Sequence, residues 1–366
     1  MLSRVAETLY WLARYIERAE NTARLLRVNA QLVMDTPRGV TPGWDALIGI
    51  VGLEREFSEC CSEPSERNVV KYLIGTIDNP GSILGALREA RDNARTVREI
   101  LPRSAWEVIN ELYLYAREHA QQGVSKKGRD EYLEQIIGGS QRLGGLFGSV
   151  MYRDEGFHFL RIGRNLERAD MTTRILDVRS TDLFDEEQIE SRTLDALQWI
   201  SVLKSMSGYQ IYRRTVQSRV RRSPALRFLL RDPHFPRSVI HCLYVAEESV
   251  GGFGTGDGVM RKLRGVARKV TRLDTDHLSQ QALHDALDNI QLGIMQVHDA
   301  LARTYFLHQY ETTASQAQSA RTHAREAFVT KGNTGVPLRL PGTRRAREAP
   351  RCHLAGACVC RDRLPG

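Results

Sequence analysis

Two segments that lie 150 residues apart carry nearly the same order of charged and apolar residues. Residues 14–28 read RYIERAENTARLLRV, and residues 164–178 read RNLERADMTTRILDV. Eight of the 15 positions are identical, whereas two unrelated windows of this length would share about one. Both segments space their apolar residues alternately by three and four positions, which is typical of an amphipathic helix. The chain is therefore expected to contain the same long helix twice.

The similarity continues beyond these two helices. Two further pairs of segments match, at offsets of 150 and 156: Asp45-Ala-Leu47 with Asp195-Ala-Leu197, and Pro80-Gly-Ser82 with Pro236-Arg-Ser238. A repeat of this length has the size of an ordinary domain and is too long for a solenoid unit. We therefore expect two homologous helical halves, residues 1–148 and 149–313, that arose by internal duplication and pack about a pseudo-two-fold axis.

Apolar periodicity predicts helices along nearly the whole body of the chain. The first should begin with Ser3 as its cap and end before Asp35-Thr-Pro37. Further helices are expected near residues 44–58, 66–77, 81–101, 104–121, 129–143, 150–178, 187–205, 209–219, 223–231, 237–249, 258–271 and 277–308. Strand-like alternation of apolar and polar residues is almost absent, so the predicted fold is all-α.

Proline and glycine give two finer expectations. The pair Asn79-Pro80 predicts a helix start, with Asn79 as the N-cap and Pro80 at the first helical position. The glycines of residues 138–148 favour a hinge between the two halves.

Composition limits the classes of protein to which the chain can belong. Its 366 residues are 42% hydrophobic, which is enough for about two folded domains. No run approaches the ~20 apolar residues of a membrane-spanning helix. The acidic residues Glu7, Glu17 and Glu20 are unlike a transit peptide, which is poor in acids. These features predict a cytoplasmic protein.

The net charge of +8 is concentrated at one end of the chain. From residue 314 onward there are ten Lys or Arg and three acidic residues, so this tail carries +7 and the remainder only +1. Residues 314–366 are expected to be a disordered basic tail that could bind polyanions. The tail cysteines Cys352, Cys358 and Cys360 lack the spacing of a zinc site. We therefore expect neither a metal nor a cofactor.

The charged residues of the repeat form the candidate polar site. On an ideal helix Arg14, Glu17 and Arg18 lie in one stripe beside the apolar seam, because they are spaced by three and four residues. The stripe recurs in the second segment, and the full candidate set is Arg14, Glu17, Arg18, Arg164, Glu167 and Arg168.

Two interpretations of this stripe remain open. The charges could form a paired network that fixes how helices dock, with Glu20 and Arg24 as an i,i+4 pair on the outside. Alternatively, the two stripes could face each other across a polar cleft. There the arginines would hold a carboxylate or phosphate in a bidentate manner, and a glutamate would act as a base or anchor an amine.

Other motifs are weaker. Glu155-x-x-His158 has the spacing of a di-iron helix but no counterpart in the first half. The His-Asp pairs at 284–285 and 298–299 are more typical of a polar helix flank than of a metal site. Residues 251–258 are glycine-rich but follow no strand and lack a Gly-Lys-Ser/Thr ending, which favours a connector. The arginines of residues 213–222 suit either a solvated face or an acidic partner.

The segments 1–20 and 153–172, together with Pro80-Gly-Ser-Ile-Leu and Asp232-Pro-His-Phe-Pro-Arg-Ser-Val, resemble the bacterial alpha-E domain family. The resemblance extends over about residues 1–313, and the Glu-Arg motif of that family falls on Glu17-Arg18 and Glu167-Arg168. It implies an all-helical cytoplasmic protein. It also implies partners, since such proteins are commonly encoded beside, or fused to, circularly permuted ATP-grasp ligases and transglutaminase-like proteins. The resemblance assigns no catalytic role.

Three functional hypotheses are compatible with these features. In the first, the protein is an accessory partner of an ATP-grasp-dependent system that forms peptide or amide bonds, and it binds ligase or substrate through the Arg/Glu stripe. In the second, it is a transferase or hydrolase that acts on small peptides, with Glu17 or Glu167 as acid or base and the arginines as carboxylate clamps. The third is a structural helical protein whose tail binds polyanions without sequence specificity.

Overall fold

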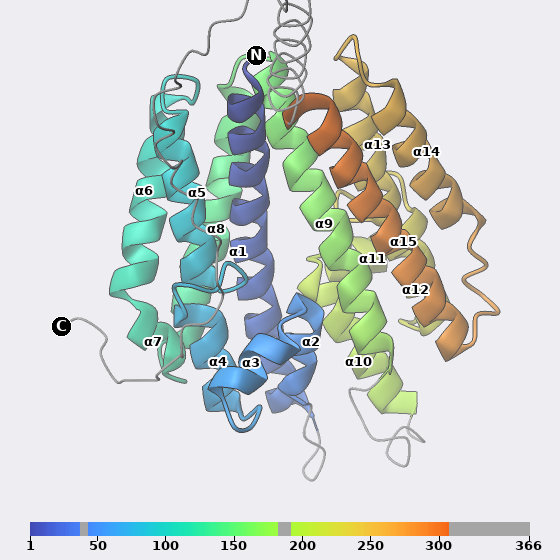
Figure 1. Cartoon of the computed structure of the whole chain (residues 1–366). Coiled ribbons are helices and arrows are strands. Elements are labelled where there is room, and N and C mark those ends of the chain that lie inside the picture. The colour runs from blue at the N-terminus through green and yellow to red at the C-terminus, as the bar shows by residue number, and fades with distance from the viewer. Residues whose placement is uncertain (37–42, 182–191, 307–366) are drawn as a thin grey trace, which may run out of the picture. The chain divides into compact units, whose positions relative to one another are not determined.

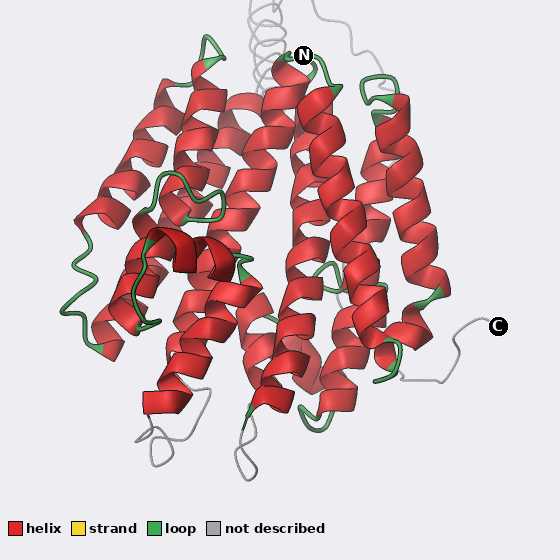
Figure 2. Cartoon of the chain, turned by 180° about the vertical axis from the view of Figure 1, so that it is seen from behind, coloured by secondary structure: helices red, strands yellow, loops and turns green. Residues whose placement is uncertain are grey.

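The computed structural model describes residues 1–36, 43–181 and 192–306. These ranges belong to one compact unit, residues 1–306, and the regular elements within them are all helical (Figure 2). The predicted all-α class is confirmed. The predicted basic tail from residue 314 lies outside the described residues. Among the described helices, none is both long enough and apolar enough to cross a membrane.

The helix bounds follow the predicted order. The N-terminal helices are α1 (Ser3–Asp35), α2 (Asp45–Val51), α3 (Glu54–Cys60), α4 (Glu66–Gly75), α5 (Ile83–Thr96), α6 (Arg103–Glu118), α7 (Ala120–Val124) and α8 (Arg129–Ser149). The C-terminal helices are α9 (Glu155–Thr181), α10 (Arg192–Ser205), α11 (Tyr209–Thr215), α12 (Arg222–Arg231), α13 (Val239–Gly251), α14 (Asp257–Arg272) and α15 (Gln280–Leu301). A short π-helical turn, Ala302–Phe306, comes after α15.

The long helices form two groups of four. Helix α1 packs with α5 and α8, and α6 closes that group; α9 packs with α13 and α15, and α14 closes the other. The two groups meet where α1 lies along α9 (Figure 1). Small residues permit this contact: a Cβ on Gly163 would lie 2.2 Å from the backbone oxygen of Tyr10. Helices α1 and α9 therefore approach each other closely enough for side chains on their flanks to interact.

Two predicted helix caps are wrong. Helix α1 begins at Ser3 itself, and no side chain caps it. Helix α5 begins at Ile83 because the Ser82 hydroxyl, rather than Asn79, accepts the bond from the first-turn amide of Gly85, at 3.0 Å. The Asn79 side chain instead accepts the amide of Gly81 at 2.8 Å within the preceding turn. Both residue types make good caps, and tertiary placement selects between them.

The predicted hinge is also wrong, because the glycines of residues 138–148 lie inside the continuous helix α8. They allow close packing instead: a Cβ on Gly139 would lie 2.5 Å from Leu112, and one on Gly144 would lie 2.7 Å from the Arg164 guanidinium. The predicted helix 44–58 is divided into α2 and α3 by Gly52, whose φ is +67°. The boundary between residues 148 and 149, which is expected to separate the two duplicated halves, stays a prediction.

Candidate functional site

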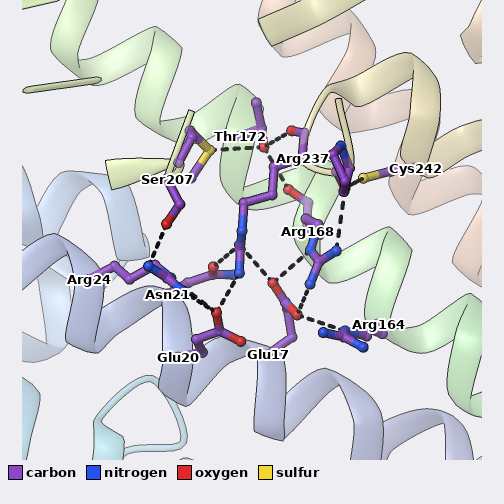
Figure 3. Close-up of polar contacts among 12 residues, drawn as sticks. Glu17, Glu20, Asn21, Arg24, Arg164, Arg168, Thr172, Ser207, Arg237 and Cys242 are labelled. Carbon is purple, nitrogen blue, oxygen red and sulfur yellow. Dashed lines mark hydrogen bonds and ion pairs between the residues drawn. The ribbon is translucent and has the colours of Figure 1, made fainter. Parts of the chain in front are cut away.

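The first half of the candidate site is the carboxylate of Glu17 on α1. It accepts hydrogen bonds from α9: the Arg168 Nε lies 2.9 Å from Oε1, and the Arg168 Nη2 lies 2.7 Å from Oε2 (Figure 3). The Arg164 Nε donates to Oε2 at 3.2 Å. Glu17 is 1% exposed, so these arginines supply the neutralising charge that a buried carboxylate requires.

The second half repeats this pattern in the opposite direction. On α9, the Glu167 Oε1 accepts the Arg18 Nε at 2.6 Å, and Oε2 accepts the Arg18 Nη2 at 3.1 Å and the Arg14 Nε at 2.6 Å. Each helix thus provides the glutamate that the other helix's arginines bind. All six predicted residues come together, and each of these ion pairs joins the two segments.

Arg237 is the main residue of the network that the predicted candidate set lacks. It lies just before α13, and its Nη1 donates to Glu17 at 2.9 Å and to the side-chain oxygen of Asn21 at 2.8 Å. Its Nη2 donates to Glu20 at 2.6 Å. The sequence feature that could have indicated Arg237 is the difference between Pro236-Arg-Ser238 and the matching Pro80-Gly-Ser82, which has glycine at that position.

The predicted pair of Glu20 and Arg24 is present, with the Arg24 Nη2 2.7 Å from Glu20 Oε1. Its predicted position on the outside is wrong, because Glu20 is 2% exposed. The reason is Arg237, which reaches over from the other group of helices and covers the carboxylate (Figure 3).

These ion pairs determine the protonation of both glutamates. Burial alone would raise the pKa of Glu167, but Arg18 and Arg14 outweigh it and hold the pKa at about 2. For Glu17, burial is likewise outweighed by Arg168 and Arg237, and the pKa lies far below its usual value. A general acid or base works best with a pKa near the operating pH. Neither carboxylate therefore suits proton transfer near neutral pH.

A buried thiol lies beside the network. Cys242 is fully buried, and burial raises its pKa to about 12. Since the thiolate is the nucleophilic form, Cys242 is unsuited to covalent catalysis.

The weaker motifs are dispersed. Glu155 is ion-paired with the N-terminal amine at 2.7 Å, and His298 contacts the Tyr10 hydroxyl at 3.0 Å. His284 instead contacts Asp177 at 2.7 Å. Asp177, His284 and Asp288 have possible metal-ligand atoms within 4.8 Å of one another. The hydrogen bond between His284 and Asp177 explains why two of these three side chains lie together.

A cleft flanks the Glu17 side of the network; we call it the Arg164 cleft. Its volume is about 290 Å³. Its polar lining comprises Glu17, Glu20, Ser140, Arg161, Arg164, Asn165, Arg168 and His241, and its apolar wall includes Phe147, Phe157 and Leu160. Among the described residues, Arg164 donates only through Nε. Its two Nη groups lie beside Gly144, which also lines the cleft, and no hydrogen bond from them is present in this part of the chain.

The electrostatics of this cleft favour an anion. Burial, and then repulsion from Arg168, lowers the pKa of Arg164. Arg164 shares the Glu17 carboxylate with Arg168 and Arg237, so a bound anion would add to the negative charge around it. For Arg14, its counterpart on α1, burial is outweighed by Tyr10 and Glu167, and the pKa is raised.

A second cleft of about 390 Å³ lies at Arg14, on the Glu167 side. Here acidic residues balance the arginines: Asp170, Asp288 and Arg174 line the cleft with Arg14. The Arg14 Nη1 also donates to the Tyr10 hydroxyl at 3.1 Å. The two clefts therefore differ in charge although the ion pairs between them match.

Comparison with known proteins gives a family but no activity. The Alpha-E family, described as a predicted alpha-helical domain with a conserved ER motif, matches residues 1–306. Uncharacterized proteins of Mycobacterium bovis and Mycobacterium tuberculosis are 24% identical over 332 residues, covering 82% of this chain and 36% of each relative. The chain thus spans about a third of the length of these curated relatives. No solved structure matches. Because the family match covers every residue that the structure describes, the chain belongs to the Alpha-E family.

Proposed function

We propose that this protein is an accessory component of an ATP-grasp-dependent system that forms peptide or amide bonds, and that it holds a carboxylate-bearing ligand in the Arg164 cleft. In this proposal the buried glutamates orient the arginines and take no part in proton transfer. The observation that carries the proposal is the Arg164 guanidinium, which is held through Nε and whose two Nη groups make no hydrogen bond to any residue that the structure describes.

The lining of the cleft supports an amino acid or short peptide as the ligand. A guanidinium fork matches a carboxylate in two-point geometry, and Arg168 adds positive charge behind it. Phe147, Phe157 and Leu160 provide an apolar wall for a side chain. Ligand sites commonly combine such a wall with a few placed polar groups.

The ATP-grasp and transglutaminase-like partners come from the family resemblance. The mycobacterial relatives contain much more chain than they share with this protein, which suits a domain that works beside other domains. The cytoplasmic location expected from the sequence belongs to the same proposal.

We also propose that the two groups of helices descend from one duplicated unit and pack about a pseudo-two-fold axis. The reciprocal pairs support this: Arg168 binds Glu17 through the same atoms as Arg18 binds Glu167. A duplication would place one network at the shared axis and one cleft on each side. The different charges of the two clefts would then reflect later divergence.

The enzymatic alternative, with Glu17 or Glu167 as acid or base, has less support because both carboxylates are buried and each is paired with at least two arginines. The tail-based alternative rests on residues 314–366, which lie outside the described part of the chain, and stays a prediction.

The test is ADP release by a circularly permuted ATP-grasp ligase over a panel of amino acids and short peptides, with and without this protein. We expect the protein to stimulate turnover or change the product, and Arg164→Gln to abolish the effect. Arg14→Gln is the matched control, because it removes the equivalent Nε bond to the other glutamate but leaves the Arg164 cleft intact.

Equal loss in both variants would assign the arginines a purely structural role. An active ligase that responds to neither wild type nor variants would contradict the accessory role. Carboxylate binding is measured separately by calorimetry with the peptides alone.

A further inference from the structure

A third cavity lies on the Glu167 side of the network, beside Gly81. We call it the Gly81 pocket. Its volume is about 190 Å³, and its polar lining consists of Arg18, Glu167, Asp170 and Arg174. It shares no residue with the Arg164 cleft, so binding in this pocket is independent of the proposed function.

Gly81 and Arg237 occupy matched places in the two groups of helices. The Thr22 hydroxyl donates to the Gly81 carbonyl at 3.3 Å, and the Thr172 hydroxyl donates to the Arg237 carbonyl at 3.0 Å. The next residue after each is a serine that caps the following helix, α5 or α13. The Gly81 pocket therefore corresponds to the place that the Arg237 side chain fills on the Glu17 side.

The carboxylates around the pocket have fewer partners than their counterparts. Glu17 Oε1 accepts from Arg168 and from Arg237, whereas Glu167 Oε1 accepts only from Arg18 among the described residues. Glu167 is 3% exposed, so this acceptor is shielded from bulk water.

The neighbouring acid shows the same difference. Glu20 accepts from Arg24 and Arg237, whereas within the described part of the chain Asp170 accepts a side-chain bond only from Arg174, at 2.9 Å. The bonds that the Gly81 side lacks are those that a guanidinium makes on the Glu17 side.

We propose that the Gly81 pocket binds the guanidinium group of a ligand, which bridges Glu167 and Asp170 as the Arg237 guanidinium bridges Glu17 and Glu20. A planar fork with several donors can reach two separate carboxylates, which a compact ammonium does less well. The volume is several times the ~30 Å³ of one water and accommodates the group with its first methylenes. Met171 replaces Asn21 at the matched position and supplies an apolar surface for that stem.

The charges are compatible with such a ligand. Two carboxylates, Glu167 and Asp170, and two guanidinium groups, Arg18 and Arg174, line the pocket, and Arg14 binds Glu167 from outside the lining. One cation bound in the pocket would take the place that the Arg237 guanidinium has beside Glu17 and Glu20. An anionic ligand would instead lie against the carboxylates of Glu167 and Asp170, and its binding is disfavoured.

The experiment titrates the full chain with methylguanidinium, with free L-arginine, and with an acetylated and amidated peptide that has one internal arginine. Calorimetry measures affinity and stoichiometry, and methylammonium and the lysine analogue of the peptide are the controls. We expect one site for guanidinium probes and weaker binding of the ammonium probes. Preference for free arginine identifies a small metabolite as the source, and preference for the peptide identifies the arginine side chain of a partner.

Gly81→Arg provides the pocket with its own guanidinium and should abolish binding. Its matched control is Gly138→Arg, which adds the same side chain at an exposed position with no neighbour within 4 Å. Because a Cβ on Gly81 would lie 2.6 Å from Leu53 Cδ1, Asp170→Asn is the second variant. It should weaken binding by about tenfold, the value of one charge-assisted hydrogen bond.

The converse variant, Arg237→Gly, opens the filled side and should raise the stoichiometry from one to two. Failure of every guanidinium probe to bind at millimolar concentration would overturn the proposal. So would binding that persists unchanged in both Gly81→Arg and Asp170→Asn, and equal affinity for ammonium would refute the guanidinium assignment. Loss of ligase stimulation by Arg164→Gln has no bearing on these outcomes.

Discussion

At the scale of single residues, Glu17 and Glu167 show what a buried carboxylate requires. Each is nearly inaccessible and has at least two arginine partners. Such a pair contributes little net stability relative to an apolar contact, but removing one partner leaves uncompensated buried charge at a cost of about 3–5 kcal/mol. The network therefore specifies how α1 and α9 align more than it strengthens their contact.

This predicts a characteristic pH dependence for Glu167→Gln. The folded-state pKa of Glu167 is about 2, below its usual 4.5, so the carboxylate contributes stability above pH 4.5 and loses it as the pH falls toward 2. The shift corresponds to about 3 kcal/mol. Denaturant unfolding should show wild type well above the variant at pH 7, with the gap narrowing steadily below pH 4.5.

The control is Glu107→Gln, at an exposed ion pair with Arg103, which should change stability by less than about 1 kcal/mol. A gap for Glu167→Gln that stays constant from pH 7 to pH 3 would show that the carboxylate charge is unimportant.

The sequence predicted all six residues of the central network because a repeated motif preserved both signs of charge. It did not predict which residues pair, because helical spacing fixes the face of a helix and leaves its neighbour open. Arg237 was missed for the same reason. Its partner Glu17 is 220 residues away, and only the folded chain brings them together.

At the scale of elements, glycine explains two errors of the sequence-based prediction. The helix pattern was predicted nearly throughout because apolar periodicity is strong. Glycine, however, can end a helix or lie within one. Gly52 ends α2 with a positive φ, while Gly139 and Gly144 lie inside α8 with Leu112 and Arg164 packed directly against them. Only tertiary contacts distinguish these cases.

Gly163→Ala should therefore destabilise the protein, because its Cβ would overlap the Tyr10 carbonyl oxygen on α1. Separation of α1 from α9 would also lengthen the ion pairs, and we expect a loss of about 1–3 kcal/mol, as for overpacked cores. Thermal unfolding measures the effect.

The comparison variant is Gly138→Ala, at an exposed helical site with free space around it. It should stabilise by up to about 1 kcal/mol through helix propensity. If Gly163→Ala were equally stabilising, the close contact of α1 and α9 would be wrong.

At the scale of the whole molecule, the two groups of helices depend on each other. Glu17 needs arginines from the second group, and Glu167 needs arginines from the first. Each group taken alone would also expose the apolar faces of α1 or α9. The sequence predicted two homologous halves but not the dependence of one group of helices on the other, since the paired charges are also compatible with a cleft open to ligand.

Fragments 1–150 and 151–306 should therefore lack a cooperative thermal transition when separate and regain one when mixed. Circular dichroism measures the transition, and the intact chain is the reference. Cooperative unfolding of either fragment alone, near the transition temperature of the intact chain, would show that the groups are independent domains.

The reciprocal ion pairs also determine the order in which contacts can form while the chain is synthesised. Glu17 must wait for Arg164, which comes 147 residues later, and for Arg237, which comes 220 residues later. At roughly 5–20 residues per second, this wait lasts on the order of 10–40 seconds. During that time the Glu17 carboxylate of α1 lacks these two arginine partners, because they have not yet been synthesised. The final packing of α1 is therefore a late step, which follows the synthesis of α9 and of Arg237.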